Sequence, residues 1–151
     1  TVDYVSVGKL RTDGYIKALE SNGIKIDENL IIKIEDIDAA EELIEHLIQN
    51  NDIDAVFAVN ELFAVTAIKQ ASKIGKKVPD DISVIGFTDG IISKYSTPSI
   101  TTVGQNGIEM GGKAAKMLIA RLESEEEEED EKYITEIIET QLVLRESTRT
   151  L

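Results

Sequence analysis

Short apolar runs alternate along this chain with stretches in which apolar residues recur every three or four positions. The clearest run spans residues 55–59, is rich in β-branched and aromatic side chains, and predicts a strand buried on both faces. The spacing over residues 62–74 predicts a helix, which Gly75 ends. A second apolar run at residues 82–87 completes a strand–helix–strand unit, and such units almost always hold parallel strands.

Short polar residues follow both predicted strands. Asn60 and Glu61 come after the first strand, and Thr88 and Asp89 come after the second. Ligands of open α/β sheets bind outside the carboxyl ends of the strands, so these residues mark one candidate site. Asn60 also suits the N-cap of the following helix, and both roles stay open, since one side chain can serve both.

The chain before this unit predicts further elements. Residues 4–7 suit a short strand or an extended entry, and residues 11–22 suit a helix. Residues 30–34 form another apolar run and predict a third strand. Asp38, with Glu41 three residues later, fits a capping box for a helix that continues to residue 50.

The chain after the unit continues the alternation. Residues 91–98 predict a loop with room for a helical turn, and residues 99–103 predict a short strand. Asn106 can cap a helix that ends near residue 122, with Glu109 at the capping-box position. Residues 134–138 and 141–144 predict two final strands. The alternating elements indicate an α/β domain with a mostly parallel sheet.

The helix over residues 62–74 is apolar on more than one face. Leu62 and Val65 lie away from its main apolar stripe, whereas a helix that covers a sheet needs only one stripe. The additional face indicates either contact with another subunit or packing under the loop at residues 91–98.

Composition narrows the possible functions. The 151 residues are 42% hydrophobic and carry a net charge of −13, to which the acidic run at residues 125–131, predicted to be a solvated loop, contributes strongly. Without a basic patch the chain is not expected to neutralise DNA phosphates, and no apolar run suits a membrane span. The first residue is Thr1 rather than Met, and we expect this chain to be a fragment.

Few of the residue types that enzymes use for catalysis occur in a suitable arrangement in this sequence. Cys is absent, and His46, the only histidine, is predicted to lie on the polar side of its helix. Thiol nucleophiles, zinc clusters and Ser/His systems are therefore not expected, and no glycine-rich dinucleotide motif follows a strand. We expect neither an enzyme nor a cofactor or metal.

Three segments resemble a known family. The segments are VPDDISVIGF, TPSITTV and the closing LVLREST, together with the Asn-Glu pair that ends a strand. They resemble the lactose-repressor (LacI/GalR) family of bacterial transcription regulators, and the similarity covers nearly the whole chain. The chain is similar to the C-terminal part of the family's effector-binding domain.

The resemblance implies a fold of two Rossmann-like lobes of periplasmic-binding-protein type, each with a three-layer parallel sheet. On that pattern, residues from about 1 to 102 and from 134 to 151 form the C-terminal lobe. Residues from about 103 to 133 form a segment that returns to the N-terminal lobe. The DNA-binding headpiece is expected before Thr1, outside this chain.

The resemblance also implies roles for individual residues. Arg11, Asn60 and Gln105 match family positions that contact the effector. Thr88 stands where the family often has an Asp, and Asp89, which follows it, is the candidate replacement. The family's dimer interface matches positions on the helix after Asn60 and on the segment near residue 91: Leu62, Phe63, Val65, Ile91 and Tyr95.

The function that the resemblance implies is allosteric regulation of transcription. A small effector, a sugar or a related metabolite, is expected to bind between the lobes of a cytoplasmic homodimer and to control DNA binding by the headpiece. The alternative is a fragment of a periplasmic sugar-binding protein that serves a transporter. The LVLREST ending and the ISVIGF segment favour the regulator.

Overall fold

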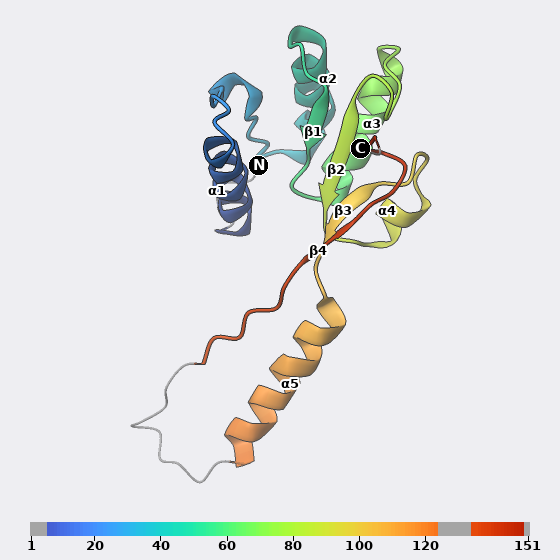
Figure 1. Cartoon of the computed structure of the whole chain (residues 1–151). Coiled ribbons are helices and arrows are strands. Elements are labelled where there is room, and N and C mark those ends of the chain that lie inside the picture. The colour runs from blue at the N-terminus through green and yellow to red at the C-terminus, as the bar shows by residue number, and fades with distance from the viewer. Residues whose placement is uncertain (1–5, 124–133, 150–151) are drawn as a thin grey trace.

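The computed structural model describes residues 6–123 and 134–149 of the chain. A four-stranded sheet with helices packed around it forms the main body, and one long helix extends away from it (Figure 1). The α/β fold class predicted from the sequence is confirmed. The acidic run at residues 125–131 lies outside the described residues.

The sheet has the strand order β1-β2-β3-β4, with β1 at Ala55–Phe57, β2 at Ser83–Phe87, β3 at Thr101–Gly104 and β4 at Gln141–Val143. The first three strands are parallel, and β4 runs antiparallel to β3. The predicted parallel strand–helix–strand unit is therefore confirmed. Because the three parallel strands end on the same side, their carboxyl ends form one edge.

Two helices bury the apolar side of the sheet. These are α2, at Ala40–Asn50, and α3, at Glu61–Lys73, which pack against each other and, through α3, against β1 and β2. Small residues on α3 let it approach the sheet closely, and Ala64, Ala67 and Ala71 are fully buried. The core that they share with the strands consists of the following residues: Ile34, Ala40, Ile44, Ile48, Ala58, Phe63, Ala64, Ala67, Ala71, Ile82, Val84 and Ile100.

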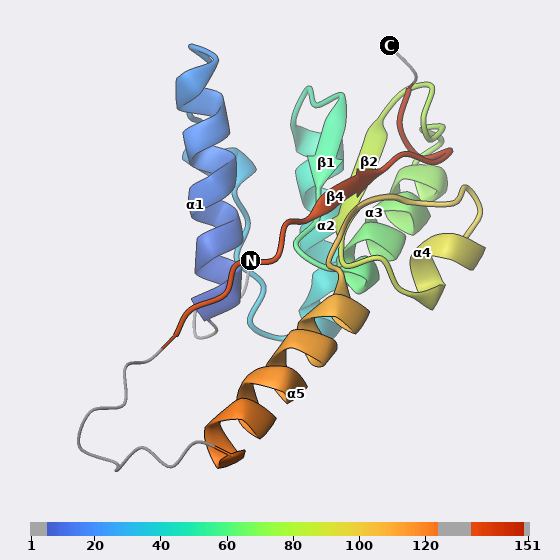
Figure 2. The same cartoon turned by 60° about the horizontal axis from the view of Figure 1, so that its bottom comes forward.

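Helix α1, at Ser6–Ser21, stands beside the β1 edge of the sheet (Figures 1 and 2). A cavity of about 530 Å³ lies between them, with Tyr15 and Leu19 on one side and Phe57 on the other. The rings of Tyr15 and Phe57 stack with their centroids 6.3 Å apart. This contact ties α1 to the sheet across an otherwise hollow apolar space.

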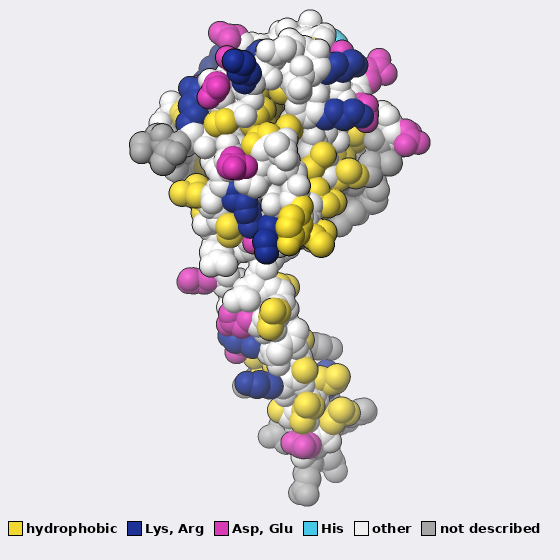
Figure 3. Space-filling model, turned by 90° about the vertical axis from the view of Figure 1, so that its right-hand side faces the viewer, with side chains coloured by type: hydrophobic (Ala, Val, Ile, Leu, Met, Phe, Trp, Pro, Cys, Tyr) yellow, Lys and Arg dark blue, Asp and Glu magenta, His cyan; other side chains and the backbone are white. Residues whose placement is uncertain are grey.

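Helix α5, at Gly107–Glu123, points away from the main body (Figures 1 and 3). None of its residues is buried, and Ile108 and Leu122 are 92% and 76% exposed. The Asn106 amide donates to the Glu109 carboxylate at 2.8 Å. This bond joins two side chains, whereas the predicted capping box pairs each side chain with a backbone N–H. Within the described residues, no helix is both long and apolar enough to cross a membrane.

Two predicted strands are wrong. Residues 30–34 contain the end of a 3-10 helix, η1 at Glu28–Leu30, followed by irregular chain that lines the cavity beside β1. Residues 134–138 are also irregular, with Ile134 and Ile137 exposed at 71% and 83%. Neither run belongs to the described sheet, whose strand order is β1-β2-β3-β4. An apolar run becomes a strand only when it joins a backbone hydrogen-bond ladder, which its composition alone does not provide.

Two predicted helix starts also differ. Helix α1 begins at Ser6, so residues 6 and 7 are not a strand, while residues 4 and 5 lie outside the described part of the chain. Asp38 does not cap α2, whose N-cap is Ala39 without a side-chain hydrogen bond. The Asp36 carboxylate instead accepts the Asp38 N–H at 3.0 Å, because a 3-10 turn, η2 at Ile37–Ala39, precedes the helix.

Candidate ligand-binding site

Asn60 stands between β1 and α3 in an extended backbone conformation. Its Oδ1 accepts the N–H of Phe63 at 2.8 Å, so the side chain is the N-cap of α3, as one of its two predicted roles required. The amide Nδ2 has no hydrogen-bond partner among the described residues. A half-buried amide with two unused N–H groups at the carboxyl edge of a sheet can donate to a polar ligand.

Arg11 reaches the same edge from α1. Its guanidinium lies 3.9 Å from the centroid of the Phe87 ring, at the end of β2, and its Nη1 donates to the Val59 carbonyl at 2.6 Å. Val59 precedes Asn60, so the structure brings Arg11, Phe87 and Asn60 to one place. Burial lowers the pKa of Arg11. Stacking fixes the plane of the guanidinium and leaves its other N–H groups for acceptors on a ligand.

Thr88 lies at the same edge with an unusual backbone. Its side chain is exposed, and its φ of 79° places a β-branched residue in the left-handed region. The Thr88 N–H donates to the Val103 carbonyl at 3.0 Å, which holds the turn after β2. Backbone strain of this kind persists where the surrounding structure enforces it, and it occurs most often at functional sites.

Asp89 is already paired within the chain. Its Oδ1 lies 2.7 Å from Nη1 of Arg145 and accepts the Thr102 hydroxyl at 3.0 Å. The hydrogen bond from Arg145 holds the pKa of the Asp89 carboxyl below its ordinary value. Asp89 therefore anchors the chain after β4 to the end of β2, a role that its position in the sequence did not predict.

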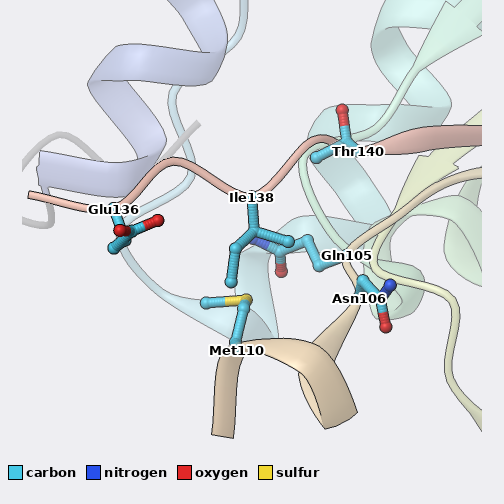
Figure 4. Close-up of a pocket in the computed structure, with 6 residues that line it drawn as sticks. All are labelled: Gln105, Asn106, Met110, Glu136, Ile138 and Thr140. Carbon is cyan, nitrogen blue, oxygen red and sulfur yellow. The ribbon is translucent and has the colours of Figure 1, made fainter. Parts of the chain in front are cut away.

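Gln105 lines a smaller hollow, to whose lining Arg11 and Asn60 do not contribute. This cavity of about 140 Å³ is formed where the chain leaves β3 for α5 and where it returns toward β4 (Figure 4). Its lining combines amide, carboxylate and hydroxyl groups with two apolar side chains: Gln105, Asn106, Met110, Glu136, Ile138 and Thr140. Gln105 thus belongs to the connection with α5.

The residues predicted to meet another subunit fall into two groups. Leu62, Ile91 and Tyr95 are 42%, 74% and 72% exposed, and the last two belong to α4, the short helix at Ile91–Tyr95. Phe63 is only 6% exposed, and Val65 is half-buried and packs against the core. Phe63 and Val65 therefore pack on the core side of α3, and contribute to such a surface only by holding the exposed residues in position.

Metal chemistry has no visible basis in the part of the chain that the structure describes. No group of three or more His, Cys, Asp or Glu side chains there could hold a metal ion. His46 is exposed on α2, as predicted. The site at the carboxyl edge is instead built from an amide, a guanidinium, an aromatic ring and a hydroxyl, which suit a neutral or weakly anionic polar ligand.

Comparison with known proteins gives the family. The family of periplasmic binding protein-like domains matches residues 2–148. The transcriptional regulator MalR of Clostridium butyricum, an HTH-type protein, is 39% identical over 148 residues, which are 97% of this chain and 43% of MalR. The chain belongs to the family of periplasmic-binding-protein-like domains.

Solved structures of LacI-type proteins share the fold. A LacI-type regulator from Bifidobacterium animalis superposes with a TM-score of 0.82 at 27% identity, over 95% of this chain and 51% of that one. A complex of the regulator CelR with cellobiose superposes with a TM-score of 0.79 at 31% identity, over 91% of this chain and 41% of that one. The present chain spans less than half the length of these curated relatives that it matches.

Sequence reasoning missed three partners within the site. Phe87, on whose ring the Arg11 guanidinium stacks, was assigned only to a buried strand. Arg145, which pairs with Asp89, was part of the LVLREST segment used for recognition. Glu61 was noted only as a polar strand end, whereas its carboxylate accepts the backbone N–H groups of Gly90 and Ser93.

Proposed function

We propose that this LacI-type chain is the effector-sensing and dimerisation region of a bacterial transcription regulator. The observation that carries the proposal is the stacking of Arg11 on Phe87 beside the unpaired amide nitrogen of Asn60. Hydroxyl-rich sugars accept and donate many hydrogen bonds, and an amide and a guanidinium next to an aromatic ring suit them. The CelR relative in complex with cellobiose supports a sugar as the ligand class.

The proposed binding site is half of a cleft. On this proposal, residues from about 1 to 102 and from 134 to 151 belong to one lobe. Residues from about 103 to 133 belong to the other lobe, whose remainder lies outside the chain. The separation of α5 from the sheet supports this division (Figures 1 and 2). Gln105, in the connection between the two parts, would contact the ligand or sense the angle between the lobes.

The proposed mechanism is a shift between two orientations of the lobes. A sugar that contacts both lobes favours the orientation in which both sets of contacts form, and differential affinity of this kind typically amounts to about 1–3 kcal/mol of coupling. The change would reach operator DNA through a headpiece outside this chain, in the cytoplasm and without catalysis. Relatives named as HTH-type regulators support this assignment over a periplasmic transport protein.

The surface proposed for the second subunit lies on α3 and α4. Leu62 and the exposed residues of α4 are the apolar side chains that a partner copy would cover. Figure 3, which faces this side of the molecule, shows hydrophobic side chains gathered over the lower part of the main body. Apolar clusters on a protein surface commonly mark association sites.

The proposal is tested with the full-length protein and a panel of mono- and disaccharides that includes cellobiose. Isothermal titration should detect a sugar bound by the wild type. Asn60→Asp keeps an acceptor that can cap α3 but removes the two amide N–H donors. We expect it to weaken sugar binding by about tenfold or more, from the loss of buried hydrogen bonds, with little change in melting temperature.

Asn60→Ala, in comparison, removes both roles and should lower the melting temperature as well as sugar affinity. The control is Asn29→Asp, which makes the same change from amide to carboxylate at an exposed residue next to Asp27. It should leave the affinity for sugar unchanged. Equal sugar affinity in the wild type and Asn60→Asp would exclude the amide from the binding site.

A further inference from the structure

Glu61 joins the binding edge to the surface proposed for dimerisation. It is the first residue of α3 and follows Asn60 directly. Its Oε1 accepts the N–H of Gly90 at 2.8 Å and the N–H of Ser93 at 2.9 Å. One carboxylate oxygen on α3 thus satisfies two backbone donors at the beginning of α4.

Helix α4 depends on partners of this kind. It has five residues, and a helix of that length does not persist in isolation, because nucleation costs more than so few hydrogen bonds return. Its N-cap, Gly90, has no side chain, so the cap is supplied from another element. Charged acceptors form stronger hydrogen bonds to backbone N–H groups than neutral acceptors do.

Gly90 is shaped to this contact. A methyl group added at Gly90 would lie 2.3 Å from Oε2 and 2.8 Å from Cδ of Glu61. The backbone of Gly90, with φ −95° and ψ −170°, is an extended conformation that other residues also adopt. The Glu61 carboxylate therefore occupies the space that a side chain at Gly90 would need, so a larger residue there would displace the carboxylate from its two N–H donors.

The side of α4 that faces away from Glu61 is apolar and exposed. Ile91, Ile92 and Tyr95 are 74%, 44% and 72% exposed, while Ser93 is fully buried. The N–H of Ser93 that Glu61 binds lies between these exposed positions in the sequence. Fixing this N–H fixes the direction in which the apolar side chains of α4 point.

We propose that Glu61 is a positioning residue that holds α4 in the orientation needed for self-association and ties it to the strand end that carries Asn60. This inference rests on the proposed function, since it assigns α4 to the dimer surface. The side chain acts through the helix that it caps, without touching the partner copy. A shift of the β1 end on sugar binding would move Glu61 and, with it, α4.

Two single variants test the proposal from opposite sides in the full-length protein. Glu61→Ala removes the carboxylate. Gly90→Ala keeps Glu61 in the sequence, but the added methyl group displaces its carboxylate. We expect each variant to raise the dissociation constant of the dimer, measured by sedimentation equilibrium, by about tenfold. An effect of this size follows from the loss of charged hydrogen bonds.

The double variant and two controls separate positioning from general stability. In Glu61→Ala/Gly90→Ala the methyl group no longer meets a carboxylate, so its dissociation constant should equal that of Glu61→Ala. Glu61→Gln keeps an acceptor oxygen at the same reach and should restore most of the affinity. Glu42→Ala, at an exposed position on α2, should leave the dissociation constant unchanged.

The outcomes decide between the two proposals. Circular dichroism confirms that each variant is folded at the temperature of the measurement, and the Gly90→Ala and Glu61→Gln pair suffices if Glu61→Ala does not fold. A dimeric wild type with unchanged dissociation constants in the variants would overturn the role of Glu61 alone. A monomeric wild type would overturn the proposed dimer surface and, with it, this inference.

Discussion

The Asp89 carboxylate lies at the carboxyl edge of the sheet, but its charge is used within the fold. It is bound by the Arg145 guanidinium and the Thr102 hydroxyl, and Arg145 also donates to the Ile100 carbonyl at 2.8 Å. The side chain of Asp89 is 30% exposed and that of Arg145 17% exposed, so the pair is partly shielded from solvent. Such pairs contribute more than exposed ion pairs do.

The stability that Asp89 contributes should depend on pH. Arg145 lowers the pKa of Asp89 in the folded chain below the unfolded value of about 3.9. The contribution is therefore fully present above about pH 4 and is lost as the pH falls through the lower, folded pKa. We expect the difference in unfolding free energy between the wild type and Asp89→Asn to shrink below pH 4, measured by urea denaturation.

The comparison with Asp89→Asn cancels the effects of other carboxyl groups that acid also protonates. Glu146 is one of these, since hydrogen bonds from Ser99 lower its pKa. A free-energy difference that stays constant from pH 7 to pH 3 would show that the Asp89–Arg145 pair does not stabilise the fold through charge.

Only part of the site could be predicted at the residue scale. The position of Asn60 after a buried strand followed from local pattern, and both its cap and its place at the edge were predictable. The approach of Arg11 to Phe87 depends on how α1 lies against the sheet, because the two residues are 76 positions apart in the chain, and no local pattern reports it. The pairing of Asp89 with Arg145 has the same cause.

At the scale of elements, residues 145–148, which follow β4, hold the parallel strands β2 and β3 together through hydrogen bonds. We call this segment the clamp. The Ser147 hydroxyl accepts the Thr101 N–H and donates to the Val84 carbonyl, and its own carbonyl accepts the Val84 N–H. The Glu146 carboxylate accepts the N–H and the hydroxyl of Ser99. Ser147 is fully buried, so these bonds form away from water. The LVLREST segment therefore has a structural role.

The end of α3 gives a matched pair of predictions about glycine. Gly75 has φ +81° with open space around it, so Gly75→Ala should lower the unfolding free energy by about 1 kcal/mol through backbone strain alone. Gly14, inside α1, has equally open space and no positive φ, so Gly14→Ala should raise the unfolding free energy by about 0.5–1 kcal/mol. Thermal denaturation of both variants should show shifts of opposite sign.

Elements with strong local signals were predictable, and those that depend on neighbours were not. Helix α3 combines an apolar stripe, an Asn cap and a terminal glycine, and its predicted bounds differ from the structure by one residue at each end. The apolar runs at residues 30–34 and 134–138 have the composition of strands but do not join the described sheet. Composition makes a segment able to form a strand, but contacts with neighbouring segments decide whether it does.

At the scale of the whole molecule, the body and α5 differ in how they are supported. Helices α2 and α3 of the body bury several residues in the core, whereas α5 buries none. Its exposed apolar side chains include Met110, Leu118 and Ile119, at 46%, 59% and 52%. A helix that buries none of its residues gains little stabilisation from packing, and helices of such length are marginal in water without it.

Hydrogen exchange should reveal this difference in the 151-residue chain. We expect backbone amides of α5 to exchange at least about tenfold faster than those of α3, because α5 can open without disrupting buried contacts. Mass spectrometry of peptides from both helices measures the two rates in one sample. Equal protection would mean that another part of the chain, or a second copy, covers α5.

The clamp formed by residues 145–148 also constrains the order of events during synthesis. Ser147 binds Val84 across a separation of 63 residues, and β4 supplies the only described partner for the outer edge of β3. On the ribosome, β3 must wait with that edge unpaired while α5 and the return segment are translated, and contacts so distant in sequence form slowly. The parallel strands can close into their final arrangement only when residues 145–148 have emerged.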